Sequence, residues 1–259
     1  MDEYRRRIAL CTELYPPSIG GQEIRFEALA KNFAARGWSV SVLCIQHEPS
    51  VPLNERRGRI DVRRMACKGG YRNPPMKWMR RRWDVIGRYA FWMNRHLREI
   101  DPELIILNQW PLLHAAALSA PQRAHAVIDW CEVRTSPFYR SVQAALPKRV
   151  KHNIAVSNGV AAAIKEASGR DVHVAPSGID ADQYRAKPRR DRSGLLYFGR
   201  VAPHKNVEFL IDSFETLCTD GYAGRLTVAG EGPSLDSVRT RAAASREAAR
   251  IDVLGRIDE

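Results

Sequence analysis

Two basic side chains near the start of a predicted helix, Arg200 and Lys205, are the residues of this chain best suited to bind an anion. They follow an apolar run at 195–198 and Gly199, a pattern that predicts a short buried strand and a glycine turn. Backbone N–H groups at the positive end of a helix attract an anion. Two cations beside them suit a diphosphate better than a single carboxylate, because its charge is larger and more spread. The alternative is that both are ordinary solvated charges on a strand–helix loop.

The elements that must position these residues alternate between strand and helix, which predicts an α/β fold with a doubly wound parallel sheet. The first part has expected strands at 7–12, 39–45, 60–65, 103–107, 126–130, 153–156 and 172–175. Its expected helices cover 22–36 and 77–100, start at Leu112, and follow a cap at Ser157.

A polar connector with proline and glycine at 176–180 and 187–194 interrupts this pattern, which then restarts with strands at 195–198, 226–229 and 251–254. Three parallel strands make a poor closed domain. We therefore expect one complete Rossmann-like domain at 1–183, a linker at 184–194 and an incomplete second Rossmann-like domain at 195–259.

Six short motifs resemble, in order and spacing, those of the family 4 retaining glycosyltransferases, which have the GT-B fold. They are residues 15–23 (YPPSIGGQE), 154–158 (IAVSN), 176–180 (PSGID), 199–205 (GRVAPHK), 228–233 (VAGEGP) and 253–255 (VLG). The resemblance covers nearly all of the chain. It implies two Rossmann-like domains that face each other across a cleft.

The resemblance also implies that a sugar is transferred from a nucleotide diphosphate sugar, with Arg200 and Lys205 holding the donor diphosphate. Gly20 and Gly21 would approach the same phosphates from the other domain, where the lack of a side chain permits close contact. The alternative for these two glycines is a plain turn before a helix. The family's loop on the nucleotide side corresponds to three residues, Gly230, Glu231 and Gly232.

No metal or other cofactor is expected, because fixed cations aimed at the developing charge lower the barrier without one. The sequence Asp180-Ala181-Asp182 has the D-x-D pattern of a metal motif. Because it lies in the connector, we interpret its aspartates as turn and helix-cap residues. The seven histidines show no metal-ligand spacing.

The chain departs from the family pattern in two places. Family members carry, after the third strand of the second domain, a segment with two glutamates that contacts the donor sugar, and this chain stops before it. Cys131 aligns with a family histidine that faces the reaction centre. The sequence thus leaves the catalytic residue unidentified, and Cys131 is expected to be a buried thiol rather than a nucleophile. Glu132 and Arg134 are candidates for the acceptor side.

The net charge of +12 belongs to one segment, since residues 56–98 hold fourteen Lys or Arg against two acids. Its predicted helix at 77–100 has an expected core face of Met79, Trp83, Ile86, Ala90, Met93 and Leu97, flanked by Trp78, Arg82, Tyr89 and Trp92. A basic amphipathic helix with aromatic residues suits an anionic membrane surface. The candidate membrane contacts are Lys77, Trp78, Arg80, Arg81, Arg82 and Arg88. A solvated helix face and nucleic-acid binding are the alternatives, and no nucleic-acid-binding motif accompanies the charge.

Composition and cysteine content indicate the cellular compartment of the protein. No apolar run approaches the roughly 20 residues that cross a bilayer, and the N-terminus enters a strand without a signal-peptide pattern. The five cysteines form an odd set without a C-x-x-C pair, as expected for reduced thiols. The sequence therefore predicts a cytoplasmic protein at the inner face of a membrane.

The leading hypothesis is a glycosyltransferase of cell-envelope polysaccharide synthesis that acts with retention on a lipid-linked or polysaccharide acceptor. The alternative is a non-catalytic truncated or split-enzyme fragment that serves as an acceptor or membrane module. A basic nucleic-acid-binding protein is a third, more remote alternative. The sequence predicts neither the sugar and nucleotide nor the oligomeric state.

Overall fold

The computed structural model covers residues 1–259 and describes all of them except 1–5, 69–70, 72–81, 180–192 and 258–259. The chain divides into two compact units, Met1–Asp180 and Ala181–Glu259, and each is described by itself. The predicted linker at 184–194 lies mostly outside the described residues.

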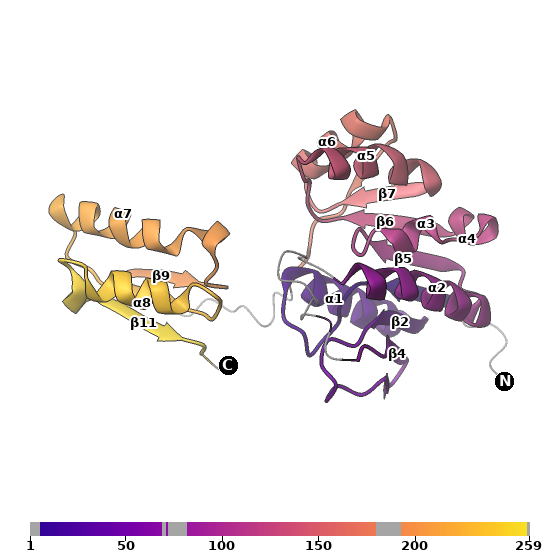
Figure 1. The fold of residues 1–259 in the computed structure, drawn as a ribbon, viewed down its shortest axis with the longest axis horizontal. Helices are drawn as coiled ribbons and strands as arrows, with labels where there is room; N and C mark the ends of the chain where they lie inside the picture. Colours follow the sequence, from indigo (N-terminus) through magenta and orange to yellow (C-terminus); the bar gives the residue numbers. More distant parts are fainter. Residues whose placement is uncertain (1–5, 69–70, 72–81, 180–192, 258–259) are drawn as a thin grey trace. The chain divides into compact units, whose positions relative to one another are not determined.

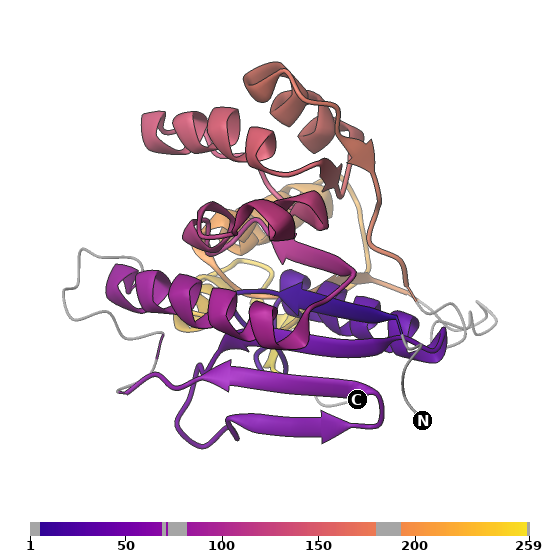
Figure 2. The ribbon, with the colours of Figure 1, turned by 90° about the vertical axis from the view of Figure 1, so that its right-hand side faces the viewer.

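Unit 1 is built on an eight-stranded sheet in the order β3-β4-β2-β1-β5-β6-β7-β8 (Figure 1). Every pairing is parallel except β3 with β4, which Figure 2 shows as adjacent purple arrows that run in opposite directions. The strands are β1 (Arg7–Cys11), β2 (Ser39–Ile45), β3 (Asn54–Arg57), β4 (Ile60–Met65), β5 (Leu104–Asn108), β6 (Ala126–Trp130), β7 (His152–Ala155) and β8 (His173–Val174). The predicted α/β class and parallel sheet are therefore confirmed.

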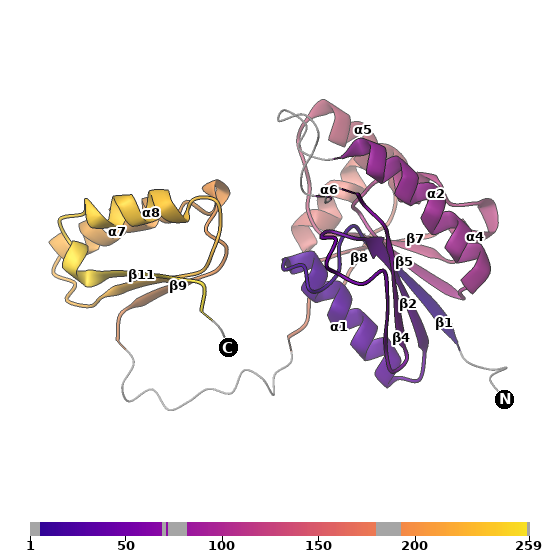
Figure 3. The same ribbon diagram turned by 60° about the horizontal axis from the view of Figure 1, so that its bottom comes forward.

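The helices of unit 1 cover both faces of this sheet. They are α1 (Gly21–Ala35), α2 (Trp83–Ile100), α3 (Leu113–Ala116), α4 (Ala120–Ala124), α5 (Pro137–Ala145) and α6 (Asn158–Ser168). In Figure 3, α1 lies on one side of β1 and α2 on the other. The alternation along β1 explains this, because Ile8 and Leu10 pack with Phe26 of α1 in one core while Ala9 and Cys11 pack in the second core, which contains α2.

Helix α2 corrects one expectation about its core face. Ile86, Ala90, Met93 and Leu97 are buried as expected, whereas the predicted flanking residue Tyr89 is fully buried. Its hydroxyl donates to the carbonyl oxygen of Leu43 at 2.6 Å, so the polar end of the ring is satisfied inside the core. The expected residues 77–81 of this helix lie outside the described residues.

Unit 2 is a three-stranded parallel sheet in the order β11-β10-β9 with its two helices packed on one face (Figure 3). Its elements are β9 (Leu195–Phe198), α7 (Val207–Thr219), β10 (Leu226–Ala229), α8 (Leu235–Ala243) and β11 (Ile251–Gly255). The expectation that β9 is a buried strand is wrong. Tyr197 packs against the helices, but Leu196 and Phe198 alternate onto the uncovered face and are 69% and 71% exposed.

Candidate functional site

The loop after β9 in unit 2 begins at the carboxyl end of the sheet, where ligands of parallel α/β sheets bind. The backbone N–H of Gly199 donates to Ala229 at 3.0 Å, and that of Val201 donates to Glu231 at 2.9 Å. The hydroxyl of Tyr197 donates to the carbonyl oxygen of Arg200 at 2.9 Å. These bonds continue the pairing of β9 with β10 past the strand ends and fix the backbone on both sides of Arg200.

Two glycines of the next loop are required by this close backbone packing. A Cβ atom on Gly230 would overlap the carbonyl oxygen of Gly199, and one on Gly232 would overlap that of Val201. Both glycines also have positive φ angles, +148° and +158°, which other residues rarely adopt. Packing therefore explains the glycine pattern that the sequence assigned to the nucleotide side, and the nucleotide contact itself stays a prediction.

Arg200 and Lys205 present their charges to solvent from this fixed backbone. Both residues are exposed, and neither forms an ion pair or side-chain hydrogen bond with any residue that the structure describes. A short 3-10 turn at Pro203–Lys205 is followed by Asn206 in the left-handed conformation, and α7 starts at Val207. The two cations and the N-terminus of α7 are therefore close in the chain, and both side chains are accessible to an anion from solvent.

The glycine loop of unit 1 precedes α1 and is held by side chains. The Pro16–Pro17 peptide bond is cis, and buried Ser18 donates to Glu23 at 3.1 Å. The fully buried side chain of Arg64 donates to the carbonyl oxygen of Pro16 at 2.8 Å. The space is open where a Cβ of Gly21 would be, with no neighbouring atom within 4 Å, whereas a Cβ on Gly20 would overlap the carboxylate of Glu23.

Arg25, on the first turns of α1, joins three parts of unit 1. Its guanidinium makes two bonds to Asp129 at the end of β6, at 2.6 and 3.1 Å. It also donates to the carbonyl oxygen of Ala175 at 2.8 Å and to the hydroxyl of Ser177 at 3.1 Å. Burial raises the pKa of Asp129, and the bonds from Arg25 oppose that shift. No local sequence pattern predicts this ion pair, because the partners are 104 positions apart.

Cys131 lies just past the end of β6, one residue from the buried Trp130. Burial raises the pKa of its thiol to about 12, so the thiol stays protonated near neutral pH and is a poor nucleophile. Its backbone N–H donates to Gln109 at 2.9 Å, which fixes the strand end. The neighbouring Glu132 and Arg134 form an ion pair at 2.8 Å.

Of the predicted membrane contacts, Lys77, Trp78, Arg80 and Arg81 lie outside the described residues. Arg82 is held by neighbours of its own chain: its side chain is 17% exposed and donates to Asp84 and to the carbonyl oxygen of Lys68. Arg88 is 59% exposed and lies 3.7 Å from Asp84. Among the described residues, no helix has the length and hydropathy needed to span a membrane.

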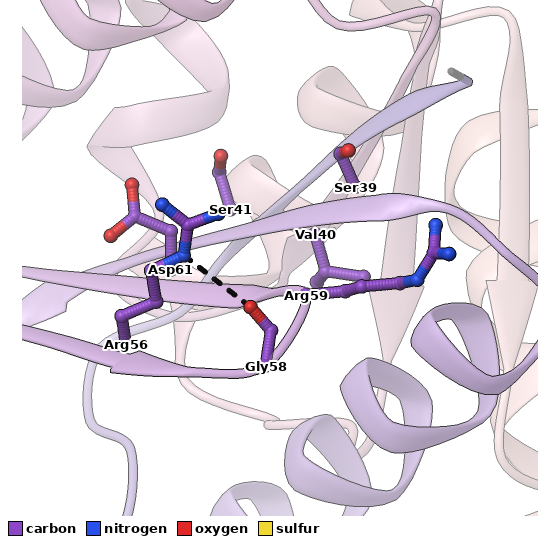
Figure 4. A pocket seen from close by; sticks show the side chains of 7 residues that line it. All are labelled: Ser39, Val40, Ser41, Arg56, Gly58, Arg59 and Asp61. Carbon is purple, nitrogen blue, oxygen red and sulfur yellow. Dashed lines mark hydrogen bonds between the residues drawn. The ribbon is translucent and has the colours of Figure 1, made fainter. Parts of the chain in front are cut away.

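A hollow of about 290 Å³ opens at the other edge of the unit 1 sheet, at the amino ends of β2 and β4 (Figure 4). The guanidinium groups of Arg56 and Arg59 point to opposite sides of it, and Arg59 donates to the carbonyl oxygen of Gly37 at 3.0 Å. The hollow therefore does not bring its cations together. No group of three or more His, Cys, Asp or Glu side chains within the described ranges could hold a metal ion.

Comparison with solved structures identifies the fold. Sucrose-phosphate synthase from Thermosynechococcus elongatus matches with a TM-score of 0.71 and 16% identity, over 98% of this chain and 71% of that one. HepE from Anabaena, solved with UDP, matches with a TM-score of 0.69 and 18% identity, over 97% and 69%. Trehalose-6-phosphate synthase from Burkholderia multivorans gives 0.66 and 15%, over 99% and 74%. The fold is thus of the GT-B type.

No curated protein matches the sequence. Two family models do, and together they span nearly the whole chain. The model described as glycosyltransferase family 4 matches residues 19–183, and the model described as glycosyl transferases group 1 matches residues 180–259. Since the first alone covers more than half of the sequence, the chain belongs to glycosyltransferase family 4.

Proposed function

We propose that this glycosyltransferase uses a nucleoside diphosphate sugar and that Arg200 and Lys205 bind its diphosphate. The observation that carries the proposal is that both cations are exposed, without an acidic partner among the described residues, on a loop with a fixed backbone. UDP is bound in the solved HepE structure, and UDP-2-fluoro glucose is bound in another matched structure.

The same two side chains account for the chemistry of transfer. As the bond between the sugar and the diphosphate breaks, negative charge grows on the leaving diphosphate. Cations held in place before the reaction stabilise this charge without reorganisation, and they therefore lower the barrier. We propose that they do so without a metal ion, so chelation with EDTA leaves transfer unchanged.

Calorimetry of the full chain with UDP tests the donor assignment. Each charge-assisted contact contributes about 1.5–3 kcal/mol, so the double variant Arg200→Ala/Lys205→Ala weakens UDP binding at least 100-fold. Arg246→Ala is the matched control, because Arg246 is exposed and follows α8, at the amino side of β11. Unchanged UDP affinity in the double variant would contradict the assignment of Arg200 and Lys205 to the donor diphosphate.

We further propose that transfer retains the anomeric configuration and that the acceptor is a lipid-linked or polysaccharide chain at a membrane. Two matched structures are enzymes of lipopolysaccharide synthesis, one of them an outer core galactosyltransferase. The outer face of α2 carries Arg88, Phe91, Arg95 and Arg98, all exposed and at helical spacing, so that an apolar ring lies among cations. All five cysteines are free thiols, which suits the cytoplasmic side of that membrane.

Vesicle sedimentation tests the membrane part of the proposal. The chain should bind vesicles that contain phosphatidylglycerol more tightly than vesicles of phosphatidylcholine alone, and Phe91→Ser/Arg88→Ser should weaken the binding several-fold. Arg170→Ser, a change of charge on another exposed loop, serves as control. Equal binding to both lipids, or a preference for duplex DNA or RNA in a gel shift, would argue against it.

A further inference from the structure

The loops that follow β5 and β6 in unit 1 are held together by two buried glutamines. Gln109 accepts two hydrogen bonds, from the backbone N–H groups of Cys131 at 2.9 Å and Glu132 at 3.1 Å. Gln143 of α5 exchanges two bonds with the backbone of Arg134, at 2.9 and 3.0 Å. The segment from Cys131 to Arg134 is thus clamped on both sides at the carboxyl edge of the sheet.

The side chains of this segment are also fixed in orientation. One carboxylate oxygen of Glu132, Oε1, accepts from Trp110 Nε1 at 2.9 Å and from Arg134 Nε at 2.8 Å. The Arg134 guanidinium lies over two rings, 4.8 Å from the centre of Trp110 and 5.1 Å from that of Tyr139. The carboxylate of Glu132 and the guanidinium of Arg134 therefore lie side by side in a fixed orientation, and the guanidinium contacts both aromatic rings.

Part of this polar pair remains available to a ligand. The side chains of Glu132 and Arg134 are 42% and 33% exposed. Among the described residues, no hydrogen bond reaches the second oxygen of Glu132 or the Nη1 group of Arg134. Phe138, whose ring packs edge-on against Tyr139, is 54% exposed. The cluster thus offers an acceptor, a donor and an apolar ring.

The charges of the cluster indicate which ligand suits it. The carboxylate of Glu132 neutralises Arg134, so the cluster has no surplus positive charge for a phosphate or a carboxylate. Neighbouring hydroxyl groups of a sugar both donate and accept, which matches an adjacent carboxylate and guanidinium. The C–H face of a sugar ring is apolar and suits contact with Phe138. This contrasts with the two cations of the loop after β9 in unit 2, which have no acidic partner in the described part of the chain.

We propose that Glu132, Arg134 and Phe138 bind an uncharged sugar ring, which is the terminal residue of the acceptor. That the bound sugar belongs to the acceptor rests on the proposed function. That these residues bind a sugar does not depend on it. Trp110, bonded to Glu132 but buried, is the natural reporter of the site.

Nuclear magnetic resonance of the full chain tests the proposal. The probes are the methyl glycosides of glucose, galactose and N-acetylglucosamine, with inorganic phosphate as the anionic comparison. At least one glycoside should shift the Trp110 indole N–H signal in a saturable way, and phosphate should not. If no glycoside shifts the signal, or phosphate shifts it as strongly, the proposal is overturned.

Variants locate the binding. Glu132→Gln and Phe138→Ser should each weaken glycoside binding at least fivefold, and Arg140→Ser should leave it unchanged, since Arg140 is exposed one residue beyond Tyr139. Phe138 is half exposed, so its variant stays folded even if Glu132→Gln does not. Wild-type affinity in Phe138→Ser and in folded Glu132→Gln overturns the proposal. UDP titration of the same samples separates the two assignments, because failed UDP binding with an intact glycoside response contradicts the donor site alone.

Discussion

The two units each place a glycine-containing loop before a helix, but they fix that loop by opposite means. In unit 1 buried side chains hold the loop and its helix, with Arg64 bonded to Pro16 and Arg25 bonded to Asp129. In unit 2 mainly backbone groups hold the loop, with Gly230 and Gly232 packed against the neighbouring carbonyl oxygens and the Tyr197 hydroxyl bonded to the carbonyl oxygen of Arg200.

This difference determines where positive charge is available. The buried arginines of unit 1 are neutralised, Arg25 by Asp129 and Arg64 by Glu55 at 2.9 Å. In unit 2 the backbone does the positioning, so Arg200 and Lys205 need no internal partner. The loop that is fixed by its backbone therefore keeps exposed cations, and the loop that is fixed by buried arginines does not.

The largest expected effect is the loss of the side-chain clamp in unit 1. Arg25→Met leaves Asp129 buried without a partner, and breaking a buried ion pair in this way costs about 3–5 kcal/mol of unfolding free energy. Urea unfolding followed by tryptophan fluorescence measures it, because all six tryptophans precede residue 131 and therefore report unit 1 alone.

The double variant Arg25→Met/Asp129→Leu is the control for that experiment. It removes both charges, so most of the stability should return even though the bonds to Ala175 and Ser177 stay lost. If the single variant is as stable as the wild type, the clamp does not hold unit 1 as described.

The glycines provide the second test of the comparison. Gly230→Ala should destabilise unit 2 by about 3 kcal/mol or more, because the new Cβ overlaps a carbonyl oxygen and the φ angle is strained. Gly21→Ala should change unit 1 by less than about 0.5 kcal/mol, because nothing lies near its Cβ position. Hydrogen exchange of the two units measures both, and equal effects would contradict the distinction between them.

Acid should affect the two units over different pH ranges. Burial lowers the pKa of His114 in unit 1 to about 3, so the unfolded chain takes up a proton from near pH 6.5 downward while the folded unit does not. Stability is therefore full above pH 6.5 and falls by at most about 1.4 kcal/mol per pH unit toward pH 3. In unit 2, hydrogen bonds from Arg241 and Ser245 lower the pKa of Glu215 to about 2, so that contribution is lost only between pH 4.5 and pH 2.

Urea titrations between pH 7 and pH 4.5 check this order. Tryptophan fluorescence should show weakening of unit 1 from pH 6, before hydrogen exchange detects a change around Glu215. His114→Leu should flatten the pH dependence of unit 1, and His125→Leu, at an exposed histidine, should not. An unchanged slope in His114→Leu would show that another group controls the acid response.

The sequence predicted the order of elements well because local patterns encode it. The apolar run of β1 and the glycine that ends α1 each lie within a few residues, and both elements occur within one or two residues of the predicted bounds. The burial of β9 was mispredicted because its apolar residues do not indicate which face a helix covers. Similarly, the helix expected from Leu112 is two short helices, and α5 went unpredicted.

The candidate site was predictable to a similar extent. Arg200 and Lys205 lie in one short motif, so a family resemblance is enough to propose them as site residues. Arg25 and Asp129 meet only because the fold brings α1 next to the end of β6. Gln109 and Cys131 meet because they follow two paired strands, β5 and β6. Contacts of that range depend on the tertiary fold, and one sequence carries no local signal for them.

The tether made by Arg25 also has a thermodynamic consequence. Because one guanidinium holds α1 and the segment at Ala175 and Ser177 together, opening of that segment must break bonds that also orient α1. Linkage is reciprocal, so anything that orders the start of α1 should slow amide exchange near Ser177 by the same free energy. The first glycine loop and the exit from the last strand of unit 1 therefore respond as a single cooperative element.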